Sequence, residues 1–149
     1  MCWTPHATVA TVVERDGRFL MIEEVSSGRV VLNQPAGHLE ENELFADAAL
    51  RETMEESGWQ VELKYLIGLY AYKSPNSKIT YHRLCFAADA VEHHPDRPLD
   101  DGILRTLWMT RDEIAENPER LRSQTVLQCI DDYLAGKHYP MDFVNENLD

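Results

Sequence analysis

The sequence predicts an α/β fold, in which a mixed parallel and antiparallel sheet is held between helices as an α/β/α sandwich. Three strand-like runs, one helix, three further strand-like runs and two helices follow one another along the chain. This order is typical of a mixed sheet covered by helices. The length of 149 residues suits a domain that buries roughly two-thirds of its unfolded surface. No repeat, low-complexity tract or linker interrupts it, so we expect one domain over residues 1–149.

The first three strands are expected before residue 36. Residues 8–13 and 19–24 are β-rich and flank a Gly-containing stretch at 14–17, which predicts a hairpin with a tight turn. A shorter strand follows at 30–32. It ends before Pro35 because proline cannot donate to the hydrogen-bond ladder of a central strand.

The first helix is predicted to begin near Asn42 or Glu43 and to end at Gly58. Asn42 can cap free N–H groups, Glu43 suits the positive end of the helix dipole, and Gly58 suits a left-handed C-cap. The face expected to pack on the sheet consists of Ala46, Ala49, Leu50 and Thr53. Three glutamates of the same helix lie about 120° around from that face, counting about 100° per residue.

The second group of strands follows the helix directly. Residues 59–72 and 79–91 are long β-rich segments, separated by a turn-like Ser-Pro-Asn-Ser stretch at 74–77. Residues 104–109 are expected to form another short strand.

Two helices are expected after the last strand. Thr110 and Glu113 have the spacing of a capping box, which predicts the start of a short helix. The segment 124–135 has helical periodicity, and Gly136 follows it as a stop signal. Its apolar face consists of Val126, Leu127, Ile130 and Leu134.

The charge balance narrows the choice of partners. The chain carries 26 acidic residues against 14 lysines and arginines, a net charge of −12. This argues against binding a long nucleic acid or an anionic membrane, since both require a basic surface. A small phosphorylated partner is compatible, because bound metal ions reverse the local repulsion. Three cysteines without metal-ligand spacing, no signal-like segment and no long apolar run favour a reduced, cytoplasmic location.

Three carboxylates crowd the last turns of the predicted first helix. Glu52, Glu55 and Glu56 fall within an arc of about 100°, where like charges repel by about 0.2–0.5 kcal/mol per pair. They also lie at the negative end of the helix dipole, which favours cations. Two interpretations fit: a solvated face of an acidic protein, or a site for a cation such as Mg²⁺ that engages substrate phosphates.

The surroundings of these glutamates have a distinctive spacing. The pattern is Gly37, five residues, Glu43, seven residues, Arg51-Glu52, two residues, Glu55-Glu56, one residue and Gly58. It resembles the Nudix box, the signature of the Nudix hydrolases, although Thr53 stands where an aliphatic residue is usual. The resemblance implies a Nudix-type α/β/α sandwich and metal-dependent hydrolysis of a diphosphate linkage in a small phosphorylated substrate.

The resemblance also implies a metal centre. Glu52, Glu55 and Glu56 match the family's metal-binding glutamates, and the Gly37 carbonyl matches a further ligand of Mg²⁺ or Mn²⁺. Glu52 is our first choice for the catalytic base that takes a proton from the attacking water. A residue outside the box is the alternative, and the number of metal ions stays open.

Arg51 and Glu43 are the other charged residues of the box. The family pattern implies that this pair holds the loop and the helix together and orients the metal ligands. The alternative is an ordinary set of helix ion pairs, because Asp47 and Glu55 flank Arg51 at i−4 and i+4.

Six residues outside these roles are candidates for substrate contacts. Asp100 and Asp101 lie where many relatives place an extra acidic ligand or base, and a solvated loop is the alternative. His38 follows the ligand glycine, where it would touch a phosphate or be a plain loop residue. The candidates for holding an organic group, or alternatively core or rim residues, are Tyr70, Tyr72 and Arg83.

The resemblance extends over nearly the whole chain, and residues 33–40 (NQPAGHLE) are its most distinctive block. Within the family it points to the NudJ group of bacterial phosphatases. That kinship implies release of inorganic phosphate from nucleoside tri- and diphosphates, thiamine pyrophosphate or its pyrimidine precursor diphosphate. Two alternatives stay open: a house-cleaning nucleoside triphosphate pyrophosphohydrolase that releases pyrophosphate, and a nucleotide-sensing Nudix domain without turnover. The sequence leaves monomer or dimer undecided.

Overall fold

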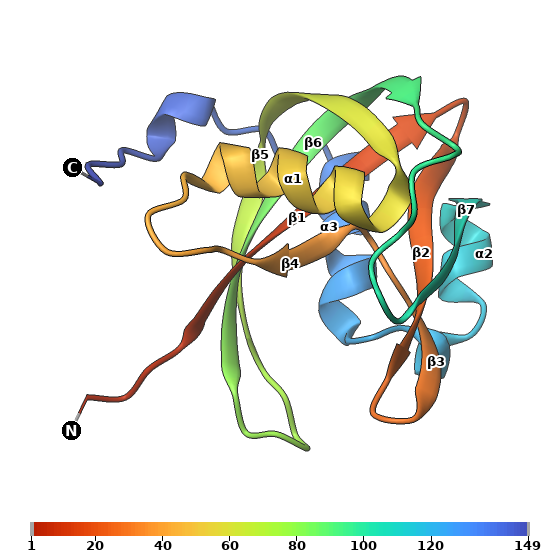
Figure 1. The fold of residues 1–149 in the computed structure, drawn as a ribbon, viewed down its shortest axis with the longest axis horizontal. Helices are drawn as coiled ribbons and strands as arrows, with labels where there is room; N and C mark the ends of the chain where they lie inside the picture. The colour runs from red at the N-terminus through yellow and green to blue at the C-terminus, as the bar shows by residue number, and fades with distance from the viewer. Residues whose placement is uncertain (1, 149) are drawn as a thin grey trace.

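A computed structural model describes residues 2–148. Figure 1 shows a strongly twisted sheet with helices on its two sides. The strands are β1 (His6–Arg15), β2 (Arg18–Ser26), β3 (Arg29–Asn33), β4 (Ala36–His38), β5 (Trp59–Lys73), β6 (Thr80–His93) and β7 (Ile103–Thr110). The α-helices are α1 (Phe45–Ser57), α2 (Arg111–Ala115) and α3 (Gln124–Leu134), and the 3₁₀ turns are Pro118–Arg120 and Met141–Phe143.

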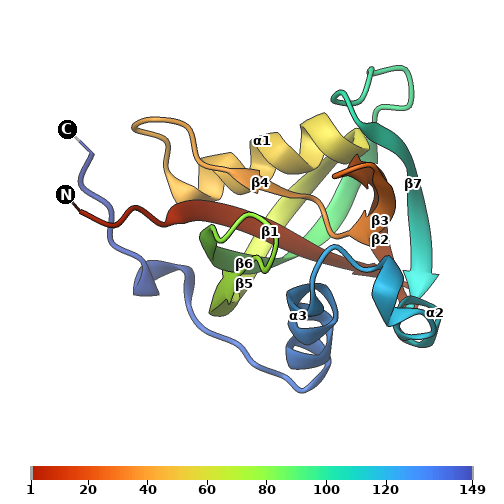
Figure 2. The same ribbon diagram turned by 90° about the horizontal axis from the view of Figure 1, so that it is seen from below.

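The strands form one mixed sheet. The spatial order is β3-β2-β1-β6-β5, with β4 paired to β1 and β7 paired to β2. Strands β1 and β6 run parallel, and the other strand pairs are antiparallel. Figure 2 shows α1 on one side of the sheet and α3 on the other. The predicted α/β/α sandwich with a mixed sheet is confirmed.

The β1–β2 hairpin forms at the predicted turn. Arg15 pairs with Arg18, so the connection has two residues, Asp16 with φ 53° and Gly17 with φ 79°. Two left-handed residues give the turn a twist that matches the flanking strands. Beyond this short ladder β1 changes partners, pairing with β4 and β6.

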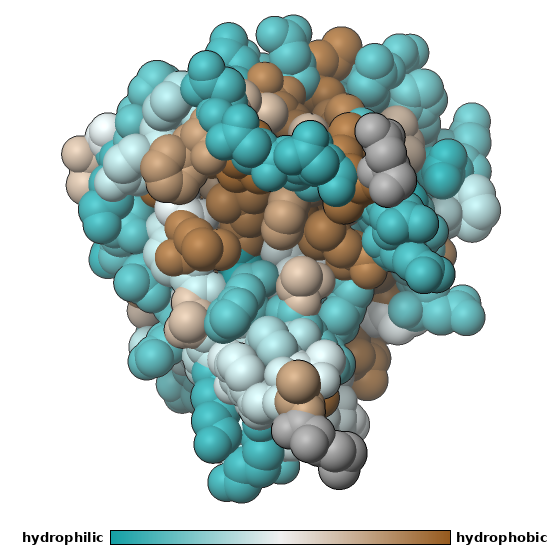
Figure 3. All heavy atoms as spheres, turned by 90° about the vertical axis from the view of Figure 1, so that its left-hand side faces the viewer, coloured by the Kyte–Doolittle hydropathy of each residue, from teal (hydrophilic) through white to brown (hydrophobic). Residues whose placement is uncertain are grey.

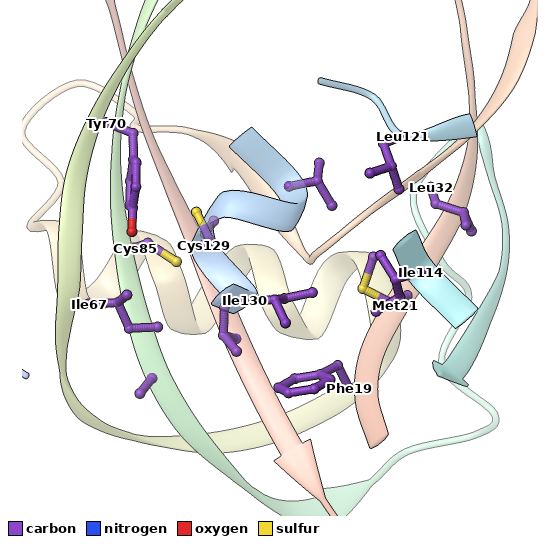
Figure 4. Packing of buried hydrophobic residues seen from close by; sticks show 14 residues of the cluster. Phe19, Met21, Leu32, Ile67, Tyr70, Cys85, Ile114, Leu121, Cys129 and Ile130 are labelled. Atoms are coloured by element: carbon purple, nitrogen blue, oxygen red, sulfur yellow. The ribbon is translucent and has the colours of Figure 1, made fainter. Parts of the chain in front are cut away.

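The side of the sheet covered by α3 holds the larger apolar core. Cys129 and Ile130 of α3 are fully buried and pack with Ile67 and Cys85 of the sheet (Figure 4). The predicted periodicity is confirmed in part. Leu134, the last residue of α3, is 51% exposed.

The first helix begins at Phe45, and the prediction of a start at Asn42 or Glu43 was wrong. Asn42 adopts φ 61° in the preceding loop, and the Glu43 carboxylate is occupied by Arg51. Neither can therefore serve as the N-cap. Leu44 stands at the cap position without a side-chain hydrogen bond. The end of the helix is as predicted, because Gly58 caps it with φ 73°.

The buried face of α1 also differs from the prediction. It consists of Ala48, Ala49, Thr53 and Ser57. Leu50, which was expected in the core, is 39% exposed. Thr53 is common to the predicted and the observed face, and its hydroxyl lies 2.8 Å from that of Thr11 on β1 and 2.7 Å from the Ala49 carbonyl. The observed face is rotated about the helix axis from the predicted one. This turn of the helix brings Glu56 toward the sheet instead of 120° away from it.

The remaining elements match the prediction with two exceptions. The capping box of Thr110 and Glu113 opens α2, with both hydrogen bonds present. Strand β4 was not predicted, because its three residues pair with β1 without any β-rich pattern of their own. The segment after α3 was also unpredicted, and Tyr139 forms a two-hydrogen-bond bridge to Leu66 at the outer edge of β5.

The C-terminal segment lies on the left-hand side of Figure 1, and Figure 3 shows apolar side chains gathered on the face turned to that side. The bridge to Leu66 covers part of the open edge of β5, which protects the strand from pairing with another chain. No helix among residues 2–148 is both long and apolar enough to cross a membrane.

Candidate active site

Arg51 on α1 is the centre of a network of carboxylates. Its guanidinium makes a two-pronged contact with Glu43, with Nε–Oε2 and Nη2–Oε1 distances of 2.7 and 2.9 Å. Its Nη1 donates to Glu52 at 2.9 Å and to Glu55 at 2.7 Å. Its Nη2 also donates to the His38 carbonyl at 3.1 Å. One arginine therefore joins the loop after β4 to the last turns of α1, which fits the orienting role better than a simple helix ion pair.

Glu43 completes the link between loop and helix. Its Oε1 accepts from the Glu40 backbone at 2.9 Å, and the hydrogen bonds from Arg51 lower the pKa of this carboxyl. Glu43 in turn raises the pKa of Arg51. The pair stays ionised at any physiological pH and fixes the loop, as paired Arg and carboxylate groups do in two-pronged geometry.

Beside Arg51 three carboxylates converge. Each of Glu52, Glu55 and Asp100 offers an oxygen, and these oxygens lie within 4.8 Å of one another. The Asp100 backbone N–H donates to the Glu55 carbonyl at 3.0 Å, which holds the β6–β7 loop against α1. Burial raises the pKa of Glu52, and burial together with Glu55 raises that of Asp100. Carboxylate oxygens that lie this close repel one another, and they are the ligands that a divalent cation such as Mg²⁺ prefers.

Glu56 lies deeper than the cluster of three. Its Oε1 accepts from the Ala36 backbone N–H at 2.8 Å. Burial raises its pKa to about 8, with further contributions from Glu24, Glu52 and Asp100. A carboxylate at this depth is costly to ionise without a nearby cation.

Gly37 lies directly against the carboxylates. A Cβ at this position would stand 2.2 Å from the carboxyl carbon of Glu52 and 2.3–2.4 Å from its oxygens. Gly37 pairs with Val9 in the β4–β1 ladder, so its backbone cannot shift to make room. The glycine is needed for space: it lets a backbone strand approach the acidic cluster.

A cavity of about 650 Å³ opens beside these groups. Glu52 and Glu56 reach it from α1, and Gly37 and His38 reach it from β4. The rest of its lining is mostly polar or aromatic and includes Asn33, Tyr72, Tyr81, Arg83, Arg122 and Thr125. The cavity has the size of a small-molecule site.

The structure brings most of the predicted substrate residues together here. His38, Tyr72 and Arg83 line the cavity, and Asp100 belongs to the carboxylate cluster. Two predicted residues lie elsewhere. Asp101 is exposed and does not line the cavity.

Tyr70 points into the core beneath α3 (Figure 4). It is 8% exposed, and its hydroxyl donates to Asp132 of α3 at 2.7 Å. It borders a separate, smaller cavity of about 380 Å³. We therefore leave Tyr70 and Asp101 out of the proposed substrate contacts.

Sequence reasoning missed Glu24 and Arg122. Glu24 on β2 is 7% exposed and forms an ion pair with Arg122, which lines the cavity. The other oxygen of Glu24 has no hydrogen-bond partner among the described residues. The sequence did offer one signal for this pair. Glu24 is a charged residue in a strand whose other residues are mostly apolar, and a buried charge needs a partner.

The chain is similar to known proteins over nearly its whole length. Residues 4–128 match the NUDIX domain family model. The chain is 36% identical to phosphatase NudJ of Escherichia coli over 142 residues, covering 95% of this chain and 92% of that protein. It also resembles a solved NUDIX hydrolase from Nitrosomonas europaea, with 41% identity, a TM-score of 0.94 and coverage of 97% and 98% of the two chains.

A more distant neighbour shares the fold alone. The NUDIX domain of NrtR from Shewanella oneidensis, solved in complex with ADP-ribose, has a TM-score of 0.72 and 15% identity, over 91% of this chain and 90% of that one.

Proposed function

The chain belongs to the Nudix hydrolase family, and we propose that it hydrolyses a diphosphate linkage in small phosphorylated substrates and releases inorganic phosphate. The observation that carries this proposal is the convergence of Glu52, Glu55 and Asp100 within 4.8 Å at the edge of a cavity large enough for a nucleotide. An acidic cluster that faces bulk solvent without a cavity would not support it.

The residues present fit a divalent cation, Mg²⁺ or Mn²⁺. Glu52, Glu55 and Asp100 would hold it, with Glu56 and the Gly37 carbonyl as the remaining oxygen donors nearby. The space that a Cβ at residue 37 would fill is what lets the backbone stand beside Glu52. When bound, such a cation neutralises phosphate oxygens and lowers the pKa of the water that attacks phosphorus.

The remaining steps depend on this chain's own side chains. Arg51 holds Glu52 and Glu55 in place by hydrogen bonds from one nitrogen, so their free oxygens stay directed toward one centre. Glu52 also lines the cavity and is our candidate for taking the proton from water. Asp100 is the candidate outside the box, because it reaches the same cluster from the β6–β7 loop.

The similarity to phosphatase NudJ supports the release of phosphate. We propose nucleoside tri- and diphosphates, thiamine pyrophosphate and its pyrimidine precursor diphosphate as substrates. Water adds to the terminal phosphorus, the bridging P–O bond breaks, and inorganic phosphate leaves together with the product one phosphate shorter.

The test is a panel of these compounds with Mg²⁺, in which the released species is identified. We expect orthophosphate from both di- and triphosphates, and loss of all turnover with chelator. Pyrophosphate from triphosphates, with diphosphates untouched, would assign the chain instead as a nucleoside triphosphate pyrophosphohydrolase. Tight nucleotide binding without turnover at any metal concentration would assign it as a sensor.

A further inference from the structure

The cavity beside the acidic cluster has a basic side. Arg29, Arg83 and Arg122 all line it, in a chain with 14 lysines and arginines against 26 acids. The carboxylates reach the cavity from α1, whereas these arginines come from β3, β6 and the segment before α3. Figure 2 shows α1 and α3 on opposite sides of the sheet. The proposed metal ligands account for the acidic side only.

Arg83 is fixed in place by uncharged partners. Its Nη1 donates to the Gln34 side-chain oxygen at 3.0 Å and its Nη2 to that of Asn33 at 3.2 Å. Gln34 is 1% exposed and is itself held by the Val126 carbonyl at 2.5 Å. The guanidinium is thus positioned by neutral amide oxygens that leave its positive charge available to an anion.

Arg122 is held in place by an ion pair with Glu24. The Glu24 carboxylate is buried and binds the guanidinium through one oxygen, while the Arg122 backbone N–H donates to the Leu32 carbonyl at 2.9 Å. The Arg122 side chain is nevertheless 43% exposed, and the exposed part lines the cavity. Arg122 and His38 of β4 line the same cavity.

The start of α3 adds to the positive potential. Ser123 caps this eleven-residue helix, its hydroxyl accepting from the Thr125 N–H at 3.3 Å. Both residues line the cavity next to Arg122. A helix N-terminus favours negative charge, and it reinforces the two arginines rather than forming a site by itself.

We infer that Arg83 and Arg122 form a subsite for the terminal, unesterified phosphate of the substrate. This inference rests on the proposed function and adds the rule by which the site selects substrates. A terminal phosphate carries about two negative charges and three acceptor oxygens, which suit two guanidinium groups. A diphosphate esterified at both ends offers a neutral sugar or alcohol there, so the Arg83 charge stays without an anionic partner and Arg122 keeps only Glu24.

The experiment compares ADP, which ends in a free phosphate, with ADP-ribose, in which both phosphates are esterified. The KM of ADP and the Ki of ADP-ribose as a competitor of ADP hydrolysis are measured for the wild-type protein and for Arg122→Gln. We expect the KM of ADP to rise at least tenfold with a smaller change in kcat, and the Ki of ADP-ribose to stay within threefold. The Ki is measurable whether or not ADP-ribose is cleaved.

Two further variants separate recognition from a structural role. Glu24→Gln combined with Arg122→Gln removes both charges of the pair, so no buried carboxylate is left without its partner. It should fold and show the same selective rise in KM. Arg122→Lys, which keeps the charge, should recover part of the affinity for ADP. Arg105→Gln, at a 62% exposed arginine paired with Glu23, is the matched control and should change neither constant.

An equal rise in the KM of ADP and the Ki of ADP-ribose would overturn the inference, and so would an unchanged KM. Either result would leave the hydrolase proposal standing, provided that the wild-type protein releases phosphate from ADP. If the wild-type protein cleaves none of the compounds in the substrate panel, the proposed function itself fails.

Discussion

The two long helices, α1 and α3, pack against opposite faces of the same sheet and follow local rules to very different degrees. Helix α3 has a serine N-cap, and its buried side is formed by Thr125, Val126, Cys129 and Ile130. The N-cap residue of helix α1, Leu44, makes no side-chain hydrogen bond, although Glu146 accepts from the Phe45 N–H. Helix α1 also turns Glu52 and Glu56 toward the protein interior. Both helices are well formed, so stability alone does not explain the difference.

The comparison of α1 with α3 shows in which part of the chain the sequence departs from the locally most stable choice. On α1 the departures concentrate in the last two turns, where Arg51 holds Glu52 and Glu55 by hydrogen bonds and Gly37 leaves the space that Glu52 occupies. Repelling groups that are held together by dedicated partners indicate a site whose function needs them. Helix α3 carries no comparable cluster among its buried residues, and we expect the part of its buried face away from the cavity, Cys129 and Ile130, to serve folding only.

The largest effect is expected from Glu56→Gln. This change keeps the size of the side chain but removes the charge of a proposed metal ligand. We expect kcat/KM for ADP hydrolysis with Mg²⁺ to fall roughly 10²–10³-fold, equivalent to about 3–4 kcal/mol, while the far-ultraviolet circular dichroism spectrum stays unchanged. Asp47→Asn, at an exposed acid in the first turn of the same helix, is the control. Near-normal activity of Glu56→Gln would contradict the metal assignment.

On α3 we expect a substitution to lower stability and to leave turnover unchanged. Ile130 is fully buried in the apolar core, and Ile130→Ala should lower the free energy of unfolding by about 2–4 kcal/mol through lost contacts and a cavity. Turnover below the melting transition should stay near the wild-type value. Leu134→Ala, at a 51% exposed position on the same helix, should cost less than about 0.5 kcal/mol. A loss of activity in folded Ile130→Ala would show that the apolar face of α3 also supports the site.

The same contrast explains how much of the fold could be predicted from the sequence. Most strands and α3 could be predicted because their signals, apolar periodicity and turn residues such as Asp16-Gly17, lie within a short stretch of sequence. The start of α1 could not, because Glu43 is engaged by a residue eight positions away. Strand β4 was also missed, since it exists only through pairing with β1. Both errors arise where tertiary contacts override local preference.

The residues of the candidate site also divide into those that could be predicted from the sequence and those that could not. The glutamates of α1 could be found from their spacing, because one helix sets their positions relative to one another. Glu24, Arg122 and the placement of Tyr70 required the sheet, because ninety-eight residues separate the Glu24–Arg122 pair. The orientation of Tyr70 depends on which face of β5 meets α3. The charge of Glu24 in a buried strand indicates that a partner exists, but local pattern does not identify a partner ninety-eight residues away.

The pH dependence of stability provides a smaller, more specific test of α1. Burial raises the pKa of Glu56 to about 8, so metal-free folded protein holds a proton that the unfolded chain releases above its ordinary pKa of about 4.5. Stability is therefore fully present below pH about 4.5 and is lost as the pH rises through about 8. We expect a decrease of roughly 2–4 kcal/mol between pH 5 and 8.5, at about 1.4 kcal/mol per pKa unit.

The measurement is urea unfolding in the presence of chelator. Glu56→Gln should flatten the decrease, and a residual slope is expected from Glu52 and Asp100, whose pKa values are shifted in the same direction. Millimolar Mg²⁺ should restore wild-type stability at pH 8.5 by binding the folded state. A stability that is independent of pH in metal-free protein would show that Glu56 is not desolvated.

The smallest effect is expected at the other end of α1. Leu44 occupies the N-cap with extended backbone angles, φ −71° and ψ 147°, and 40% exposure, so a hydroxyl there would reach a free N–H of the first turn. Leu44→Ser should stabilise the protein by about 0.5–1 kcal/mol and leave kcat/KM unchanged, as measured by urea unfolding and ADP turnover. The missing cap would then be incidental, in contrast to the carboxylates of the last turns. A loss of turnover in Leu44→Ser would instead extend the functional part of α1 to its whole length.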